Sequence, residues 1–328
     1  MLKIGVLGAG HLGKIHLKCI RQSGKYDLVG FYDTAKDVAK AVSEEFSIPC
    51  FDDMQALIDA VDVVDIVTPT TYHFKCIKAA LEHHKHIFVE KPVVATMEEA
   101  EALVKLAVGE GVKIQVGHVE RFNPAFAGAA PFIDKPKFIE VHRLAEFNPR
   151  GTDVPVELDL MIHDIDILLS IVKSEVSHIS ASGVAIVSPT ADIANARIEF
   201  ANGTVANLTA SRLSLKNMRK MRIFQNDAYI SVDFLEKSTD IVRLLDNGDP
   251  QNPLSVPIDL PNGTHKHLTF ERPRCKSVNA IEEELSTFAD AINNGTTPVV
   301  TLEDGVRALD LAYRIMAAVD ESINRVKA

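Results

Sequence analysis

The sequence contains no tryptophan, few cysteines and no long hydrophobic run. None of its 328 residues is Trp, and its four cysteines are widely scattered. No two of them have the spacing of a redox motif or a metal site, so we expect reduced thiols without a structural role. No apolar run approaches the ~20 residues that cross a bilayer, so we expect no membrane-spanning helix. The cysteines are Cys19, Cys50, Cys76 and Cys275.

Positive charge is also scarce. The chain has 35 Lys and Arg against 45 Asp and Glu, a net charge of −10. A general nucleic-acid binder presents a basic surface, so we expect no nucleic-acid partner, while a local basic pocket for a phosphorylated substrate stays open. Residues Leu2–Leu7 have the pattern of a strand rather than of a signal peptide. We therefore expect a cytoplasmic protein.

Residues 1 to about 120 alternate short apolar runs with helical segments. Strands separated by helices of this length indicate βαβ units and a parallel sheet. We expect strands at 3–7, 28–32, 48–51, 61–67, 86–89 and 113–116, and helices at 12–23, 38–45, 54–60, 74–83 and 97–110.

After Asn123-Pro124 the pattern changes to long strand-like runs. The runs Ala194–Phe200 and Thr204–Ser211 flank an Asn-Gly pair, which is a strong hairpin signal. The second half therefore predicts a large, mainly antiparallel sheet. Further expected elements are strands at 221–225, 228–233 and 241–245, helices at about 157–172, 279–293 and 302–324, and a Pro/Asn-rich loop at 250–263.

The fold class that follows is α/β with two domains. Residues 1–122 are expected to form a dinucleotide-binding domain with a doubly wound parallel sheet of the Rossmann type. Residues 123–328 are expected to form an α+β domain with a large, mainly antiparallel open sheet, which serves substrate binding and oligomerisation. The last helices of this second domain could pack back on the first.

A glycine motif, Gly8-x-Gly10-x-x-Gly13, follows the first strand and opens the first helix. Gly8 allows a tight turn, Gly10 lets the backbone approach a pyrophosphate, and Gly13 lets helix and strand pack closely. The start of the helix, with His11 and Leu12, offers unpaired N–H groups to the phosphates. This context predicts a bound dinucleotide.

Asp33 ends the second strand, 20 residues after Gly13. An acidic residue there can accept both ribose hydroxyls and repel a 2′-phosphate, so we expect NAD in preference to NADP, although Lys36 is near enough to weaken that preference. Thr68-Pro69 follows a strand of the same sheet and should lie over the cofactor. His73 is equally consistent with a cofactor contact and with a solvent-facing or helix-capping histidine.

The turn Glu90-Lys91-Pro92 ends the apolar run Ile87–Val89, at a sheet edge where open α/β sheets bind ligands. Oxidising an alcohol with a nicotinamide needs a base for the hydroxyl proton and a group that stabilises the developing alkoxide. A lysine supplies both if burial and a nearby positive nicotinamide lower its pKa. Lys91 is therefore a catalytic candidate and Glu90 a cofactor neighbour. An ordinary Lys-Pro surface turn is the alternative.

Asp159 and His163, four residues apart, should share one face of an apolar helix. A histidine can act as a base when a carboxylate orients it, so both are catalytic and substrate-binding candidates. A buried Asp–His pair that merely satisfies itself is the alternative. Asp166 follows His163 on the same face, and Asp164 is expected to face solvent or the domain boundary.

The segment after the strand 113–116 lies at the expected domain junction. His118, Arg121 and Asn123 could hydrogen-bond a polyol or a phosphate there, whereas an Arg121–Glu120 pair that stabilises the hinge is the alternative. The sequence has no HExxH, CxxC or clustered carboxylates, so we expect no metal.

In order and spacing, these segments resemble the Gfo/Idh/MocA family of nicotinamide-dependent oxidoreductases. The match extends from residue 1 to about 170 and includes a closing segment at 284–309. The resemblance implies that Lys91 and the Asp159/His163 pair perform the acid–base work on sugars or inositols. It also implies dimers or tetramers that associate through the C-terminal sheet. Met161 stands where many members have glycine, which should reshape the floor of the substrate pocket.

Within the family, residues 116–125 and 159–164 resemble the branch that oxidises C3 of UDP-N-acetylglucosamine. A basic run could meet the diphosphate together with Arg121, or it could be a solvated face. The expected activity is an NAD(P)-dependent dehydrogenase acting on a secondary alcohol of a sugar or nucleotide sugar. A free-polyol dehydrogenase and a non-catalytic dinucleotide-binding regulator remain as alternatives. The basic run comprises Arg212, Lys216, Arg219, Lys220 and Arg222.

Overall fold

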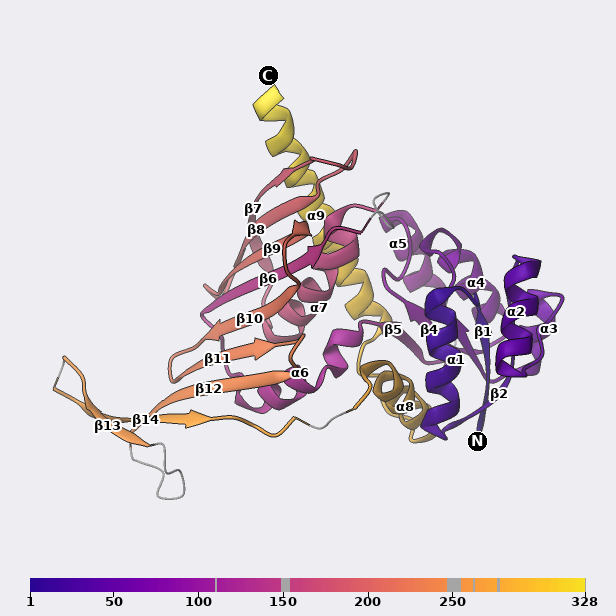
Figure 1. Ribbon diagram of the computed structural model, residues 1–328, viewed down its shortest axis with the longest axis horizontal. Helices are drawn as coiled ribbons and strands as arrows, with labels where there is room; N and C mark the ends of the chain where they lie inside the picture. The colour runs from indigo at the N-terminus through magenta and orange to yellow at the C-terminus, as the bar shows by residue number, and fades with distance from the viewer. Residues whose placement is uncertain (110, 149–153, 247–254, 262, 276–277, 328) are drawn as a thin grey trace. The chain divides into compact units, whose positions relative to one another are not determined.

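The computed structural model describes residues 1–109, 111–148, 154–246, 255–261, 263–275 and 278–327. The chain forms two compact units (Figure 1). The first comprises residues 1–122 and 278–310, and the second comprises residues 123–277 and 311–328. Residues 278–310, which the sequence analysis assigned to the second domain with an allowance for packing back, thus belong to the first unit.

The first unit is built on a parallel sheet of five strands in the order β2-β1-β3-β4-β5. The order reverses between β1 and β3, and ligands of doubly wound sheets bind at such a point. The strands are β1 (Leu2–Leu7), β2 (Tyr26–Tyr32), β3 (Val63–Ile66), β4 (His86–Glu90) and β5 (Ile114–Gly117). The expected strand at 48–51 is wrong, because only one bridge, Phe31 to Cys50, forms there.

Helices cover this sheet, and the closing segment supplies one of them. Helix α8 packs against α1, where Leu285 and Phe288 are fully buried and the Phe288 ring lies 6.1 Å from the ring of Phe88. Local signals set the helix ends, since Asp53 caps α3 and Thr96 caps α5 through side-chain oxygens. The helices are α1 (His11–Ser23), α2 (Lys36–Phe46), α3 (Met54–Ala60), α4 (His73–Glu82), α5 (Met97–Ala107) and α8 (Ala280–Asn293), with short 3₁₀ turns η1 (Thr70–Tyr72) and η2 (Val119–Phe122).

The second unit is built on nine strands in the order β13-β14-β12-β11-β10-β6-β9-β8-β7. All neighbours are antiparallel except β6 and β9, so the expectation of a large, mainly antiparallel sheet is confirmed. The strands are β6 (Phe138–Glu146), β7 (Val176–Val184), β8 (Ile193–Phe200), β9 (Val205–Ser214), β10 (Met218–Phe224), β11 (Ala228–Asp233), β12 (Ser238–Leu245), β13 (Val256–Asp259) and β14 (His265–Glu271).

Strand β13 lies inside the segment that was expected to be loop. Pro257 is tolerated because β13 is an edge strand, where a missing N–H removes no ladder bond on the outer side. The strand is only four residues long and contains a proline, so the sequence pattern does not indicate it. Residues 250–254 and 262 of the expected loop lie outside the described residues.

One face of this sheet is buried beneath helices and the other is polar. On β8, Ala194, Ala196 and Ile198 are fully buried, whereas Asn195 and Arg197 are exposed on the opposite face. In Figure 1 the helices of this unit lie on one side of the sheet. They are α6 (Pro124–Ala129), α7 (Ile162–Ile171) and the end of α9 (Leu302–Lys327), with a 3₁₀ turn η3 (Ala130–Phe132).

The expected helix at 157–172 begins as a π-helix, η4 (Glu157–Met161), and continues as α7. Asp164 was expected to face solvent or the domain boundary, and it does not face solvent. Asp164 is 2% exposed, and its oxygens accept from Arg143 Nε and Nη2 at 2.8 and 2.7 Å. This two-pronged ion pair attaches α7 to β6, because a buried carboxylate requires such a partner.

We predict that Arg143→Met lowers the free energy of unfolding by about 3–5 kcal/mol, because it leaves the buried carboxylate of Asp164 without its cation. Chemical denaturation measures this change. Lys220→Met is the matched control, because it breaks an ion pair with Asp233 in which the lysine is half exposed, and such a pair should contribute at most about 1 kcal/mol. Equal losses in the two variants would contradict the assignment of the Arg143 pair as a structural anchor.

Candidate functional site

The glycine loop has the geometry that close approach of a ligand requires. Gly8 has φ +95, and a Cβ there would lie 2.7 Å from the Val67 carbonyl oxygen. A Cβ on Gly13 would lie 2.1 Å from the Gly8 carbonyl oxygen, whereas a Cβ on Gly10 would meet nothing within 4 Å. Gly8 and Gly13 are therefore needed by the fold, and Gly10 leaves an open approach to the backbone.

A cavity of about 700 Å³ opens at the carboxyl ends of β1 and β3, above this loop. Its volume and its place at the topological switch suit a dinucleotide. It also includes side chains that the motifs did not indicate, among them Tyr32, Met54 and Lys75. The predicted residues that line it are Gly8, Gly10, His11, Leu12, Asp33, Thr68 and Pro69.

Asp33 is held in place at one end of this cavity. The Ala9 backbone N–H donates to Asp33 Oδ2 at 2.7 Å, and the Ala35 N–H donates to Oδ1 at 2.8 Å. Each carboxylate oxygen keeps a further lone pair for a ligand donor. Lys36 is exposed and does not line the cavity. The arrangement thus fits an acceptor for ribose hydroxyls.

His73 takes a structural position instead of lining the cavity. It is 1% exposed, with Nδ1 2.9 Å from the Pro92 carbonyl oxygen and Nε2 2.9 Å from that of Thr68. Burial lowers the pKa of His73 against the opposing effect of the two carbonyls. The ring therefore ties together the two loops that follow β3 and β4.

Lys91 follows β4, and its peptide bond to Pro92 is cis. Its backbone N–H donates to Glu90 Oε2 at 3.2 Å. Glu90 is only 9% exposed and lies beneath the turn, where its other oxygen faces the buried His16. Neither residue lines the 700 Å³ cavity, so Glu90 is placed to act through its neighbours.

Sequence reasoning missed two acidic residues of this region. Asp65 is fully buried in β3 and lies 3.0 Å from His16 Nδ1, and Glu284 of α8 is fully buried near the same cluster. A carboxylate in the middle of the apolar run 61–67 is a signal that could have indicated Asp65, because a buried charge needs a partner. No comparable signal precedes Glu284.

In the second unit, Asp159 belongs to η4 and His163 to α7, and both are half-buried. The junction between the π-helix and the α-helix lies between them. Such π segments are frequent at functional sites. The neighbouring Glu157 is 1% exposed, and burial raises the pKa of its carboxyl. Met161, the departure from the family pattern, is fully buried.

His118 and Arg121 belong to the first unit, and Asn123 belongs to the second. His118 is 1% exposed, and the half-buried Arg121 donates its backbone N–H to the His118 carbonyl at 3.0 Å. Asn123 begins the second unit and caps α6, while its Nδ2 donates to the Phe234 carbonyl at 3.0 Å. These bonds explain the burial of Asn123 without a substrate.

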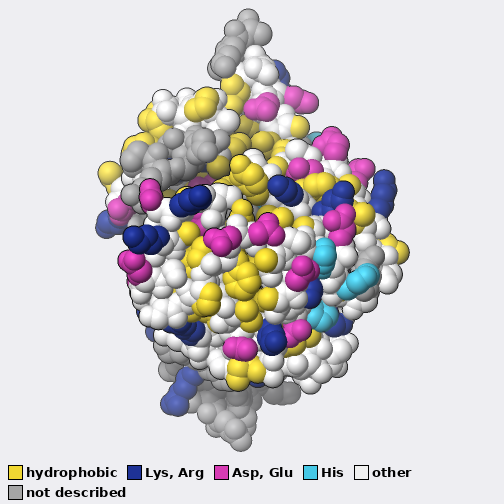
Figure 2. Space-filling model, turned by 90° about the vertical axis from the view of Figure 1, so that its right-hand side faces the viewer, with side chains coloured by type: hydrophobic (Ala, Val, Ile, Leu, Met, Phe, Trp, Pro, Cys, Tyr) yellow, Lys and Arg dark blue, Asp and Glu magenta, His cyan; other side chains and the backbone are white. Residues whose placement is uncertain are grey.

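The basic run is largely a solvated sheet surface with acidic neighbours. Lys220 pairs with Asp233 at 3.0 Å and Arg222 with Glu140 at 2.8 Å, while the buried Arg212 donates to the Val154 carbonyl. Figure 2 draws a different face, on the right-hand side of Figure 1, and shows Lys and Arg interspersed with Asp and Glu there.

No described helix has the length and apolar character that a membrane crossing requires. Within the same residues, no group of three or more His, Cys, Asp or Glu side chains is arranged to hold a metal ion.

Comparison with known families decides the assignment. Residues 2–118 match the model of the oxidoreductase family with an NAD-binding Rossmann fold, and residues 147–231 match that of the GFO/IDH/MocA C-terminal domain. The chain belongs to the Gfo/Idh/MocA oxidoreductase family. It is therefore an NAD-binding oxidoreductase, and the resemblance, the fold class and the enzyme class inferred from the sequence are confirmed.

Among its relatives is UDP-N-acetylglucosamine 3-dehydrogenase of Acidithiobacillus ferrooxidans, 40% identical over 242 residues, which are 73% of this chain and 76% of the relative. A solved structure of that enzyme aligns with a TM-score of 0.87 and 33% identity over 98% of both chains. The scyllo-inositol 2-dehydrogenase (NAD(+)) of Bacillus subtilis is 30% identical over 342 residues, covering 94% of this chain and 92% of the relative.

The glycine geometry predicts opposite outcomes for two similar changes. Gly10→Ala should keep the thermal unfolding temperature but weaken NAD binding about tenfold or more, because its Cβ occupies only the ligand's approach. Gly13→Ala should destabilise the fold itself, because its Cβ would overlap the Gly8 carbonyl. Calorimetric NAD titration and thermal melts distinguish them. A Gly10→Ala protein with normal NAD affinity would disprove the assigned approach.

Proposed function

We propose that this protein is an NAD-dependent dehydrogenase that oxidises the C3 hydroxyl of UDP-N-acetylglucosamine or a closely similar nucleotide sugar. The observation that carries the proposal is the 40% identity with a UDP-N-acetylglucosamine 3-dehydrogenase, together with a backbone match over 98% of both chains. The sequence pattern of residues 116–125 and 159–164 supports the same branch of the family.

NAD, in preference to NADP, is the cofactor in this proposal. The open approach at Gly10 and the clamped carboxylate of Asp33 fit the pyrophosphate and the adenosine ribose. The repulsion between Asp33 and a 2′-phosphate disfavours NADP, and the exposed position of Lys36 offers little relief. When bound, the nicotinamide supplies the acceptor for the hydride.

The acid–base work is assigned to His163, Asp159 and Lys91. His163 takes the hydroxyl proton, and Asp159 orients its ring and balances its charge. Lys91 holds and polarises the reacting oxygen. Glu90 and His73 support the turn and the loops around Lys91 instead of contacting the cofactor, and Asn123 supports the fold. On the substrate side, Arg121 and His118 are the proposed partners of the sugar and diphosphate.

A free-polyol dehydrogenase is the second candidate. In the sequence alignments, the scyllo-inositol 2-dehydrogenase covers 94% of this chain and the nucleotide-sugar enzyme covers 73%. A cytoplasmic location stays a prediction from the sequence.

The decisive prediction concerns substrate choice. The purified full chain should reduce NAD with UDP-N-acetylglucosamine, should do so more slowly with NADP because of Asp33, and should not use N-acetylglucosamine, glucose, myo-inositol or scyllo-inositol. Absorbance at the reduced-nicotinamide band measures this. Reduction with a free inositol but not with the nucleotide sugar would replace the proposal by its alternative.

Variants act as controls for the chemistry in that assay. Lys91→Met and His163→Ala should each lower kcat by about 10²–10⁴-fold, the usual contribution of general acid–base groups. Their affinity for NAD should stay within about threefold of the unmodified protein. Loss of NAD binding in both variants would make the two residues structural instead of catalytic.

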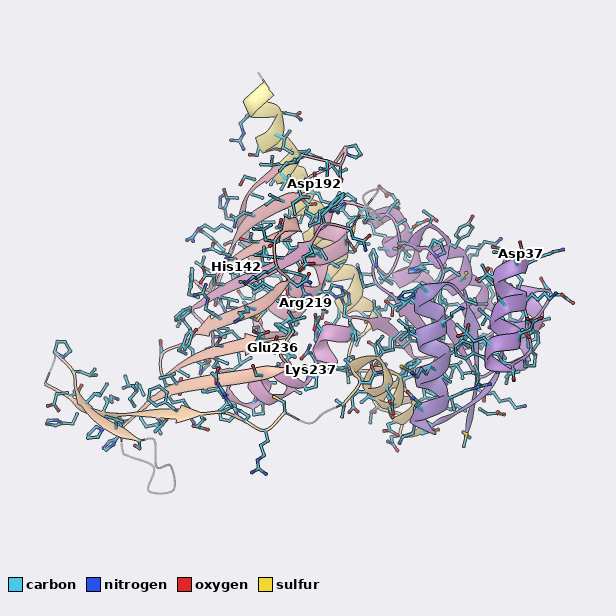
Figure 3. All side chains as sticks on the ribbon, in the orientation of Figure 1. Asp37, His142, Asp192, Arg219, Glu236 and Lys237 are labelled. Carbon is cyan, nitrogen blue, oxygen red and sulfur yellow. The ribbon has the colours of Figure 1, made fainter. Side chains whose placement is uncertain are left out.

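We further propose a homodimer or homotetramer that associates through the polar face of the nine-stranded sheet. This face carries a depression of about 480 Å³ lined by Glu140, His142, Asn195 and Arg197. Figure 3 draws His142 and Arg219 on opposite sides of the sheet, consistent with their register. Alternating exposed polar residues on neighbouring strands suit a self-complementary interface.

Light scattering should give the mass of two or four chains. Asn195→Arg should lower that mass, because it places a bulky charge in the centre of the face. Asp37→Arg is the control, because it lies exposed on α2 of the first unit and should leave the mass unchanged. A monomeric unmodified protein at micromolar concentration would refute this part of the proposal.

A further inference from the structure

A chain of buried charged side chains lies beneath the Glu90-Lys91-Pro92 turn. His16 of α1 is fully buried, with its Nδ1 3.0 Å from Asp65 Oδ2 and its Nε2 3.1 Å from Glu90 Oε1. Asp65 comes from β3 and Glu90 from β4, so three elements of the first unit meet in this contact. We name Asp65, His16 and Glu90 the buried triad.

The contacts of the buried triad indicate its charges. An ionised carboxylate only accepts hydrogen bonds, so a ring nitrogen that faces one must carry a proton. Both nitrogens of His16 face carboxylates, which identifies the ring as an imidazolium. Burial opposes this charge, but Asp65 and Glu90 raise the pKa of His16 well above its ordinary value. Burial also opposes ionisation of Glu90, yet His16 and Lys91 outweigh it and lower its pKa.

A third carboxyl group, that of Glu284, lies near the buried triad. Glu284 of α8 is fully buried, and neither of its carboxyl oxygens has a hydrogen-bond partner among the described residues. Burial, followed by the negative charge of Glu90, raises the pKa of Glu284 well above its ordinary value. An uncompensated buried carboxyl takes up a proton. Burial raises the pKa of Asp65 as well, and the contact with His16 opposes that effect.

Each carboxylate oxygen of Glu90 has its own partner. Its Oε1 faces His16, and its Oε2 accepts the backbone N–H of Lys91 at 3.2 Å. The neighbouring strand β5 leaves room for it only because residue 117 is glycine, since a Cβ there would lie 2.9 Å from Glu90 Oε1. The carboxylate is thus held next to Lys91 by three separate elements.

We propose that the buried triad is a positioning device for Lys91. It holds the Glu90 carboxylate ionised and fixed beside Lys91, and thereby favours the protonated ammonium form of that lysine. Glu90 is then a positioning residue, which acts on the reaction through Lys91. This inference rests on the proposed role of Lys91 in turnover.

The direction of the pH effect follows from the charges. Removing the negative charge of Glu90 favours the neutral amine, so Lys91 should lose its proton at lower pH. Burial raises the pKa of Cys19 on α1 and of Tyr26 on β2, which favours their neutral forms, and it lowers the pKa of His73 on α4 against the opposing effect of two carbonyls. Glu284 on α8 is neutral as well.

Competitive acetylation of the full chain with acetic anhydride across a pH series, followed by peptide mass spectrometry, measures the protonation of Lys91 without turnover. Glu90→Gln should move the labelling midpoint of Lys91 to lower pH by on the order of one unit. Glu284→Gln is the matched control and should leave the midpoint unchanged, because it replaces one buried neutral group by another. Glu90→Asp keeps the negative charge, so its Lys91 midpoint should lie close to that of the unmodified protein.

The alkaline limb of the kcat profile of Glu90→Gln should move in the same direction, with NAD affinity retained. An unchanged Lys91 midpoint in folded Glu90→Gln protein would overturn the inference, as would an equal shift in Glu284→Gln. If Glu90→Gln does not fold, the unmodified protein still tests it: a Lys91 midpoint more than about one unit below that of the exposed Lys40 would refute a stabilised ammonium.

Failure of the proposed function has a different signature. If Lys91→Met retained turnover, the catalytic role of Lys91 would be wrong whatever the labelling showed. If Lys91→Met were inactive but Glu90→Gln left both the midpoint and the pH profile unchanged, the role of the buried triad alone would be wrong.

Discussion

The close packing of α1 on β1 is the constraint on which the first unit depends. A Cβ at residue 13 would approach the Gly8 carbonyl to 2.1 Å, so only glycine allows the helix to begin where it does. This approach directs the N-terminus of α1 into the cavity at the switch between β1 and β3. It also brings His16, one turn further along, into the centre of the unit between Asp65 and Glu90. The ligand site and the buried charges are thus consequences of one steric condition.

Charge in the interior of both units is arranged in compensated groups. His16 separates two carboxylates in the first unit, and Arg143 neutralises Asp164 in the second. Buried charges without such partners would cost several kcal/mol each. The two groups differ in what lies next to them. Arg143 anchors α7, which carries His163, whereas Glu90 contacts the backbone of Lys91 itself. Both therefore place a candidate catalytic residue by means of a buried ion pair.

Several sequence predictions were wrong for identifiable physical reasons. Asp164 was expected at the surface because an acid in an apolar helix has no visible partner, and Arg143 is distant in sequence. The ligand contacts expected of His73, Glu90 and Asn123 stay predictions, and their polar atoms also contact backbone carbonyls, a histidine and a helix end. The edge strand β13 was missed because only its pairing with β14 stabilises it. In each case the partner that decides the outcome lies elsewhere in the sequence and comes close only in the folded chain.

The sequence by itself determined the parallel and antiparallel halves, the glycine loop, Asp33 and the family. All of these features follow from local periodicity or from motifs whose residues lie within one turn or one strand. Only the tertiary structure decided that Asp65, His16, Glu90 and Glu284 meet, because they come from four elements between residues 16 and 284. It also decided which polar residues face the cavity and which support it. Contacts over such separations depend on how the sheet and its helices close around one core, and local pattern does not encode them.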